Sequence, residues 1–155
     1  MRKITLICVG NLKEKFFRDA FLEYEKRLSK FFDFKIVEIA ESKLVKVGEA
    51  EIKKVVEQEG EKILKKIEGK RIICLAIEGE VVDSVRFSEI VARESDLGEV
   101  CFVIGGSYGI YEKIKNMGKN VSFGRITLPH QLCRIVFMEQ LYRAGTIINN
   151  IEYHK

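Results

Sequence analysis

The stretch Val100-Cys101-Phe102-Val103-Ile104 is followed directly by Gly105-Gly106-Ser107-Tyr108-Gly109. Five consecutive apolar residues are typical of a central parallel strand that is covered on both faces. The glycines predict a turn in which the backbone can approach a neighbour or a ligand closely. A second apolar run, Arg71 to Ile77, ends in the same way at Glu78-Gly79. These two runs predict the centre of a parallel sheet, and the fold class is therefore α/β.

Amphipathic segments lie between the predicted strands. Apolar residues recur every three or four positions in Glu14–Phe31 and Glu49–Ile67, which predicts two helices that each bury one face. Further strands are predicted at Ile4–Val9, Phe34–Ile39 and Asn120–Phe123, and further helices at Ser84–Glu94, Tyr111–Met117 and from Pro129 to about Ala144. Ser84 is the expected cap of its helix. Strands that alternate with helices predict a mainly parallel sheet flanked by helices, and we expect one domain over residues 1–155.

The composition excludes several classes of protein. Apolar residues make up 46% of the chain and charged residues 32%, which is typical of a globular protein rather than a disordered one. No apolar run approaches the roughly 18 residues that span a bilayer, and no signal peptide is evident, so we expect a cytoplasmic protein without a membrane partner. The four cysteines are Cys8, Cys74, Cys101 and Cys133, and none forms a Cys-x-x-Cys pair. This spacing supports neither a metal site nor a disulfide framework.

Three strand ends are candidates for a ligand site, because open α/β sheets bind ligands beyond the carboxyl ends of their strands. They are Leu75–Ile77, Gly105-Gly106 and the stretch Phe123–Leu128 that follows a third strand. If these strands are neighbours, the three ends line one pocket. The glycine cluster lacks the G-x-G-x-x-G spacing and the Gly-Lys-Ser/Thr of a phosphate-binding loop, which disfavours a dinucleotide-dependent enzyme. A plain strand-to-helix turn stays open as an alternative.

Positive charge is concentrated in the last quarter of the chain. Residues 119–155 hold five basic and two acidic side chains, and so carry three of the four net positive charges. A local positive field attracts phosphate. Arg143 lies four residues after Glu139, which favours an ion pair on one helix. Arg134 has no such local partner and is the better candidate for contact with a phosphate or a base.

The predicted helix after Pro129 is apolar around nearly its whole circumference, which indicates burial on more than one side. A homodimer is the favoured explanation, and a central core helix in a monomer is the alternative. His130 lies in the first turn, where the positive end of a helix disfavours the imidazolium, so a neutral imidazole could accept a proton there. His154 lies beside Tyr153 at the other end. The sequence leaves a structural hydrogen bond or a plain surface position open for both histidines.

The chain resembles the SPOUT-class ribosomal RNA methyltransferases, specifically the RlmH family, which N3-methylates a pseudouridine in large-subunit ribosomal RNA. The similarity covers essentially the full length of the chain. Each short sequence segment that carries it is common alone, but all of the segments in this order and spacing are specific to the family. The pieces are Val9-Gly10-Asn11-Leu12-Lys13-Glu14-Lys15, Glu23-Tyr24-Glu25-Lys26-Arg27-Leu28, Glu59-Gly60, Leu75-Ala76-Ile77-Glu78-Gly79, Phe102-Val103-Ile104-Gly105-Gly106-Ser107, Thr127-Leu128-Pro129-His130-Gln131-Leu132, Glu139-Gln140-Leu141-Tyr142-Arg143-Ala144 and Tyr153-His154-Lys155.

This resemblance implies a fold with a C-terminal trefoil knot, an obligate homodimer and S-adenosylmethionine (SAM) as cofactor, bound bent in the knot. The implied SAM contacts are Leu75, Gly105, Phe123, Gly124, Arg125, Ile126, Thr127 and Leu128, which belong to the three strand ends described above. The implied activity is methylation of a pseudouridine at N3 in 23S ribosomal RNA, on assembled ribosomes. The chain departs from the usual family pattern at Gly124, where a serine is frequent, and at Lys155, which replaces an arginine.

Direct methyl transfer of this kind needs a base for the N3 proton and no metal. His130 and His154 are the candidate bases, removal of the proton by solvent is the open alternative, and Arg134 is a further catalytic candidate. The expected RNA contacts are Arg134, Arg143 and Lys155 for the backbone, and the rings of Tyr142 and Tyr153 for stacking on an exposed base. A non-catalytic, homodimeric module that binds ribosomes or RNA is the alternative function. Binding of SAM separates the two, because a module of that kind does not need it.

Overall fold

The computed structural model describes residues 1–155 and contains five strands and five helices. In chain order they are β1 (Arg2–Val9), α1 (Lys15–Leu28), β2 (Phe32–Ile39), α2 (Glu49–Leu64), β3 (Arg71–Val81), α3 (Ser84–Leu97), β4 (Val100–Ile104), α4 (Glu112–Lys115), β5 (Lys119–Ser122) and α5 (His130–Ile148). The predicted α/β class is confirmed. None of the helices combines the length and the apolar character needed to cross a membrane.

All five strands form one parallel sheet in the order β2-β1-β4-β3-β5. The strand β4 lies at the centre, and every one of its five residues is buried, as the continuous apolar run predicted. Its neighbour β3 is fully buried only at Ile72, Ile73 and Cys74. The strands β4, β3 and β5 are adjacent, so their carboxyl ends meet at one edge of the sheet.

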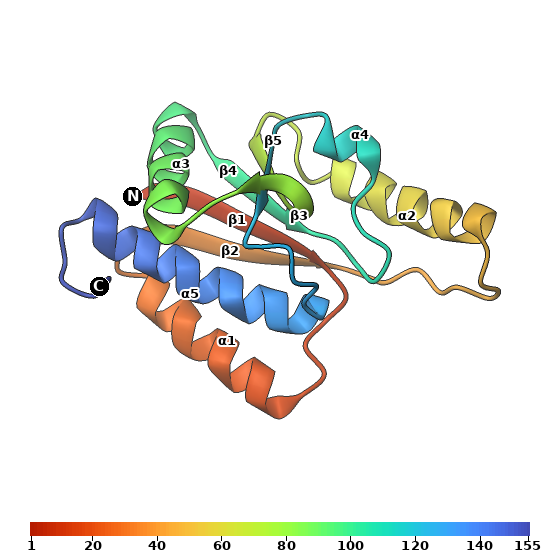
Figure 1. Ribbon diagram of the computed structural model, residues 1–155, viewed down its shortest axis with the longest axis horizontal. Coiled ribbons are helices and arrows are strands. Elements are labelled where there is room, and N and C mark those ends of the chain that lie inside the picture. The colour runs from red at the N-terminus through yellow and green to blue at the C-terminus, as the bar shows by residue number, and fades with distance from the viewer.

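Helices cover both faces of the sheet (Figure 1). On one face, α1 and α3 both pack against α5, and the core there includes Phe87, Phe102 and Phe137. On the other face, α2 and α4 cover a second core that includes Ile63, Val103 and Ile114. The C-terminal residues turn back beside α5 after that helix ends, as Figure 1 shows. The trefoil knot that the family resemblance implies stays a prediction.

Several element boundaries differ from the sequence predictions. Ser84 is not the cap of α3: the side chain of Asp83 accepts a hydrogen bond from the backbone nitrogen of Arg86, at 2.7 Å. The hydroxyl of Ser84 instead donates to Gln140 of α5, also at 2.7 Å, and so ties the two helices together. The helix α5 begins one residue after Pro129 and continues four residues beyond Ala144, because its last turns are buried against the rest of the fold.

The strand β3 also continues past the predicted end at Ile77. Both Leu75 and Glu80 pair with Val121 of β5, so residues 76–79 leave the sheet between two paired positions. This bulge places Gly79 directly over β5, where an added Cβ would lie 2.6 Å from the backbone of Asn120. Only glycine fits such an approach, and the bulge carries the neighbouring side chains away from the sheet and toward its carboxyl edge.

Candidate functional site

A pocket of about 530 Å³ opens at the carboxyl ends of β3, β4 and β5, beside the first turn of α5. Its size lies within the usual range for small-molecule sites. Eleven of its twenty lining residues are hydrophobic. Of the residues predicted to contact SAM, those that line the pocket are Leu75, Gly105, Phe123, Gly124, Ile126, Thr127 and Leu128. The sequence prediction that three strand ends share one pocket is therefore confirmed.

Arg125 is the one predicted SAM contact that does not line the pocket. Its guanidinium donates a hydrogen bond to the carbonyl oxygen of Ile77, which lies in the β3 bulge. This bond links the loop after β5 to the bulge after Leu75. Arg125 therefore holds two walls of the pocket together from the outside.

The glycine turn after β4 forms a wall that no side chain could replace. A Cβ added at Gly105 would lie 2.7 Å from the backbone of Gly109, and Gly109 itself has a φ of 93°. The turn closes with a hydrogen bond from the Gly109 nitrogen to the Gly106 carbonyl oxygen, at 3.2 Å. A wall made of bare backbone lets a flat ring approach closely and offers polar groups for its edge.

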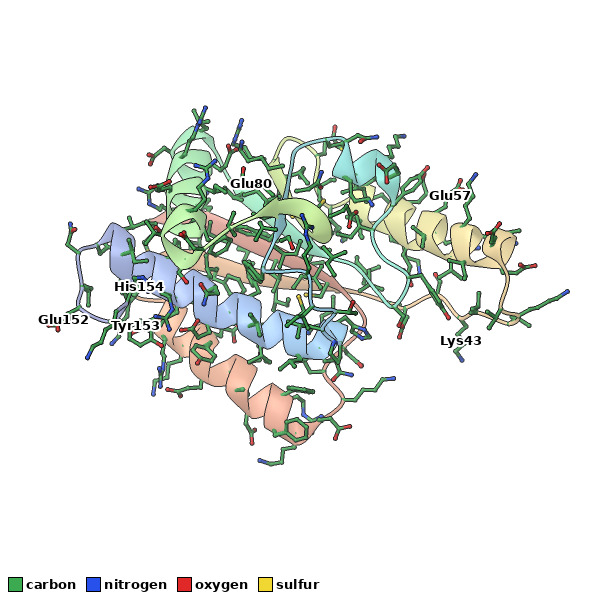
Figure 2. All side chains as sticks on the ribbon, in the orientation of Figure 1. Lys43, Glu57, Glu80, Glu152, Tyr153 and His154 are labelled. Carbon is green, nitrogen blue, oxygen red and sulfur yellow. The ribbon has the colours of Figure 1, made fainter.

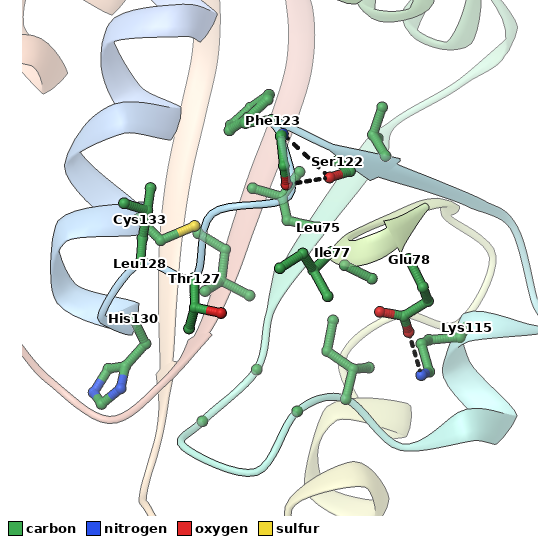
Figure 3. A pocket seen from close by; sticks show the side chains of 18 of the residues that line it. Leu75, Ile77, Glu78, Lys115, Ser122, Phe123, Thr127, Leu128, His130 and Cys133 are labelled. Carbon is green, nitrogen blue, oxygen red and sulfur yellow. Dashed lines mark hydrogen bonds and ion pairs between the residues drawn. The ribbon is translucent and has the colours of Figure 1, made fainter. Parts of the chain in front are cut away.

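His130 lies at the rim of the pocket, where α5 begins (Figure 3). A Cβ added at Gly10 would lie 3.8 Å from Nε2 of His130 and 3.9 Å from a carboxylate oxygen of Glu41. The side-chain oxygen of Gln131 accepts from the Lys13 backbone nitrogen at 3.1 Å. The first turn of α5 is thus fixed against the segment that follows β1, and the imidazole has a defined place.

Arg134, the predicted contact for a phosphate or a base, is buried and pairs with a carboxylate of the same chain. Its side chain is only 2% exposed, and Nη1 contacts a carboxylate oxygen of Glu38 at 2.7 Å. Its Nη2 donates to the carbonyl oxygen of Gly10 at 3.0 Å, while Nε has no partner. Because the guanidinium is buried against Glu38 and Gly10, Arg134 has no exposed donor for an RNA phosphate. It ties α5 to the ends of β1 and β2.

The C-terminal tail folds back on the far end of α5, where Tyr153 and His154 lie (Figure 2). Nη2 of Arg143 contacts Glu139 at 2.5 Å, as the four-residue spacing predicted, and the Tyr153 hydroxyl donates to the same carboxylate at 3.2 Å. The Arg143 guanidinium lies 4.8 Å from the centre of the Tyr153 ring. It also lies 3.2 Å from Nδ1 of His154. Arginine can only donate, so Nδ1 accepts and the ring proton is on Nε2.

The structure therefore separates the predicted site residues into two groups. His130 lies with the predicted SAM contacts, whereas Arg143, Tyr153 and His154 form a cluster toward the other end of α5. Tyr142 joins the second group, with its ring centre 4.9 Å from that of Tyr153. Glu139 and Arg143 lie 9 and 13 residues after His130 on α5, so at 1.5 Å per residue the cluster lies about 14 to 20 Å along the helix from His130. Lys155 is exposed at the end of the chain.

Sequence reasoning missed Glu78, Lys115 and Cys133, which also line the pocket. Glu78 directly follows a predicted strand end, and this position could have indicated that it lines the pocket. Lys115 and Cys133 come from α4 and α5, and only the folded chain shows that they face the same space. The thiol of Cys133 is not activated, because burial raises its pKa. Burial likewise raises the pKa of the Cys8, Cys74 and Cys101 thiols to about 12.

A parallel sheet with an apolar, glycine-walled pocket at its carboxyl edge is typical of an α/β protein with a site for a nucleoside-sized ligand. A family model described as "Predicted SPOUT methyltransferase" matches residues 2–154. The chain belongs to this SPOUT methyltransferase family. It is a methyltransferase, and enzymes of this class use SAM as methyl donor. Family membership supports the catalytic interpretation over the non-catalytic binding module.

Similar proteins have been named in several bacteria. The chain is 45% identical over 158 residues to a protein of Streptococcus equi subsp. zooepidemicus and 46% identical over 158 residues to one of Streptococcus uberis. Each alignment covers 99% of both chains, and both proteins are called "Ribosomal RNA large subunit methyltransferase H".

Solved structures of distant sequence share the fold. A probable methylase family protein from Haemophilus influenzae aligns with a TM-score of 0.57 at 13% identity, over all of this chain and 72% of that one. TrmJ from Z. mobilis aligns with a TM-score of 0.53 at 9% identity, over 94% of this chain and 70% of that one. At such low identity these likenesses concern the fold alone.

The pocket also fits SAM on its own features. Its apolar centre suits an adenine ring, and its glycine turn leaves room where a Cβ would clash. The residues that would hold the cofactor are Leu75, the Gly105 turn and the loop from Phe123 to Leu128. No group of three or more metal-binding side chains is present in the structure.

Proposed function

We propose that this protein is a homodimer that methylates N3 of a pseudouridine in 23S ribosomal RNA, on assembled ribosomes in the cytoplasm. The observation that carries the choice of substrate is the 45–46% identity, over 99% of both chains, to proteins named as large-subunit ribosomal RNA methyltransferases. The exposed basic residues Lys119, Arg125 and Lys155 support it further, since RNA binding needs cations that face the phosphates.

Bound SAM would supply an electrophilic methyl group on a sulfonium, so that a nitrogen nucleophile forms the new bond as the sulfur–carbon bond breaks. The protein has to orient the two reactants and take the proton from N3. His130 is the proposed base, because it is the histidine that lines the pocket. The contacts of Gly10, Gln131 and Arg134 hold the helix that carries this imidazole in place.

The cluster of Tyr142, Arg143, Tyr153 and His154, together with Lys155, would contact the RNA. Tyr142 and Tyr153 offer stacking faces, and Arg143 and Lys155 offer cations for the backbone. Within one chain this cluster lies about 14 to 20 Å from His130 along α5. A second copy of the chain can bring its own tail to the pocket, and this is the main structural argument for the proposed dimer.

Large apolar side chains that remain exposed also support the dimer. Val81 lies at the end of β3, Val85 in the first turn of α3 and Ile126 in the loop after β5, and all three are exposed. Leu132, Ile135 and Val136 of α5 are only partly buried within one chain. Contact with a second copy would remove these side chains from water.

Substitution of the two histidines tests the proposed base. Ribosomes that lack the modification serve as substrate, and methyl incorporation is measured at saturating SAM. His130→Ala should lower the rate about 100-fold, as loss of a general base usually does, while the Kd for SAM stays near that of the wild type. His154→Ala is made in parallel, because its role as the base was an open alternative.

Cys133→Ala is the matched control, since it truncates a neighbouring pocket side chain that takes no part in proton transfer. It should keep most of the rate. Full activity in both histidine variants would remove both as candidate bases. A wild-type protein that binds SAM but leaves such ribosomes unmodified would overturn the choice of substrate.

A further inference from the structure

The pocket has an uneven distribution of charge. Among its twenty lining residues, the only ones with a formal charge at neutral pH, apart from the titratable imidazole of His130, are Glu78 and Lys115. These two lie together at one side of the pocket, and His130 lies at the other (Figure 3). The wall between them is formed by apolar side chains and by the glycine turn.

The two charged groups are held firmly before any ligand arrives. Nζ of Lys115 lies 2.7 Å from a carboxylate oxygen of Glu78 and 3.1 Å from one of Glu112. The Lys115 backbone carbonyl accepts from the side-chain amide of Asn120 at 3.0 Å. The Lys115 side chain is 19% exposed and that of Glu78 is 58% exposed, so both keep a solvent-facing part.

Both groups stay charged at neutral pH. The hydrogen bond from Lys115 lowers the pKa of Glu78, and the same bond raises the pKa of Lys115. An ammonium has three donors, and the two carboxylates occupy two of them. One donor of Lys115 and one oxygen of Glu78 are therefore available to a further charged partner.

The cofactor has one end that requires such partners. Its methionyl part carries an ammonium and a carboxylate, and burial of these charges against an apolar wall is costly unless they are paired. The adenine ring suits the apolar centre, and the methyl group has to face the acceptor nitrogen near His130. We propose that Glu78 and Lys115 form the subsite for the methionyl zwitterion, with Lys115 bound to the carboxylate and Glu78 to the ammonium.

This subsite depends on the proposed function only in that the protein uses SAM. Direct measurement of ligand binding therefore tests the subsite without RNA. Calorimetry would compare four ligands: SAM, S-adenosylhomocysteine, decarboxylated SAM and methylthioadenosine. The first two carry the full zwitterion, the third lacks the carboxylate, and the fourth lacks the whole amino-acid end. Lys115→Met should weaken SAM and S-adenosylhomocysteine about tenfold and leave the other two within about twofold.

Glu78→Gln provides an independent second variant of nearly the same shape. It should weaken about fivefold every ligand that carries the ammonium, decarboxylated SAM included, and leave methylthioadenosine unchanged. Lys119→Met is the matched control, because it removes the same charge from β5, four residues away and outside the lining of the pocket. It should leave all four affinities within about twofold.

The four ligands distinguish failure of the proposed subsite from failure of the whole SAM site. If Lys115→Met weakens methylthioadenosine as much as SAM, the ion pair only shapes the pocket and the subsite is overturned. Unchanged binding of SAM in both variants overturns it as well. If the wild-type protein binds none of the four ligands, the SAM site itself fails, and the subsite fails with it.

Discussion

At the scale of single residues, Arg134 has the most unusual environment in the chain. Burial of a guanidinium is costly unless its donors are paired, and here one nitrogen stays without a partner. Its carboxylate partner, Glu38, is 46% exposed and remains hydrated. The two halves of the pair are therefore not equivalent: loss of Glu38 leaves a buried cation, whereas loss of Arg134 leaves an anion in contact with water.

This asymmetry predicts unequal effects on stability. Glu38→Ala should lower the free energy of unfolding by about 3 kcal/mol, close to the cost of an unpaired buried charge. Arg134→Met should cost about 1 kcal/mol, because it unpairs only the carbonyl of Gly10 and a hydrated carboxylate. Chemical denaturation at a single protein concentration measures both. The double variant should cost less than the two single variants together, since they share one interaction.

The exposed pair of Arg27 and Glu23 on α1 is the control, with its nitrogen and oxygen 3.0 Å apart. Glu23→Ala should leave the free energy of unfolding nearly unchanged, because the pair is exposed to solvent. If Arg134→Met destabilises the protein more than Glu38→Ala, the buried cation is not the costly partner and this account of the pair is wrong.

At the scale of elements, much of the fold follows from local patterns. The apolar runs at β3 and β4 and the amphipathic segments between them predicted alternating strands and helices, because parallel strands are buried on both faces and their helices on one. The same reasoning predicted that the ends after Leu75, Gly105 and Phe123 share a pocket. The prediction succeeded because the carboxyl ends of neighbouring parallel strands meet at one edge.

What the sequence did not reveal depends on contacts between distant residues. The partner of Arg134 lies 96 positions away on β2, so no helical spacing could indicate it. The bulge of β3 arises because Glu80 pairs again with the strand that Leu75 has just left. The short helix α4 places Lys115 beside Glu78 only after the glycine turn has reversed the chain. Each of these features forms only when the strands have assembled into the sheet.

The bulge predicts a sensitive position at Gly79. A Cβ there would lie 2.6 Å from the backbone of Asn120, so Gly79→Ala has to push the bulge away from β5. The pocket wall formed by Ala76, Ile77 and Glu78 would move with it. We expect a loss of at least about 1 kcal/mol in stability and at least tenfold weaker binding of SAM. Denaturation and calorimetry on the same sample check both effects.

Gly98→Ala serves as the comparison, because a Cβ there would meet only the Arg71 side chain at an ordinary 3.8 Å. It lies after α3, away from the pocket, and should leave SAM binding unchanged. Normal SAM binding by Gly79→Ala would show that the pocket does not depend on the shape of the bulge.

At the scale of the whole molecule, the long helix α5 separates two groups of residues that the proposed reaction needs together. The pocket and His130 lie at its start, and the cluster of Arg143, Tyr153 and His154 lies at its end. The helix is rigid and the tail is bonded to it, so one chain cannot bring the two groups into contact without releasing the tail. A symmetric dimer in which each tail serves the other pocket removes this conflict.

Mixed dimers test this arrangement directly. A chain with His130→Ala has a defective pocket and an intact tail. A chain with His154→Ala has an intact pocket and a defective tail, because it loses the contact that holds the tail to Arg143. Each variant alone should be impaired in methyl transfer. If tails act on the partner's pocket, a purified heterodimer of the two contains one fully intact site and should recover about half of the wild-type rate. If each tail serves its own pocket, both sites of the heterodimer stay defective and its rate equals that of the parents. Sedimentation of the same sample has to show a dimer, and a monomer with full activity would contradict the shared site altogether.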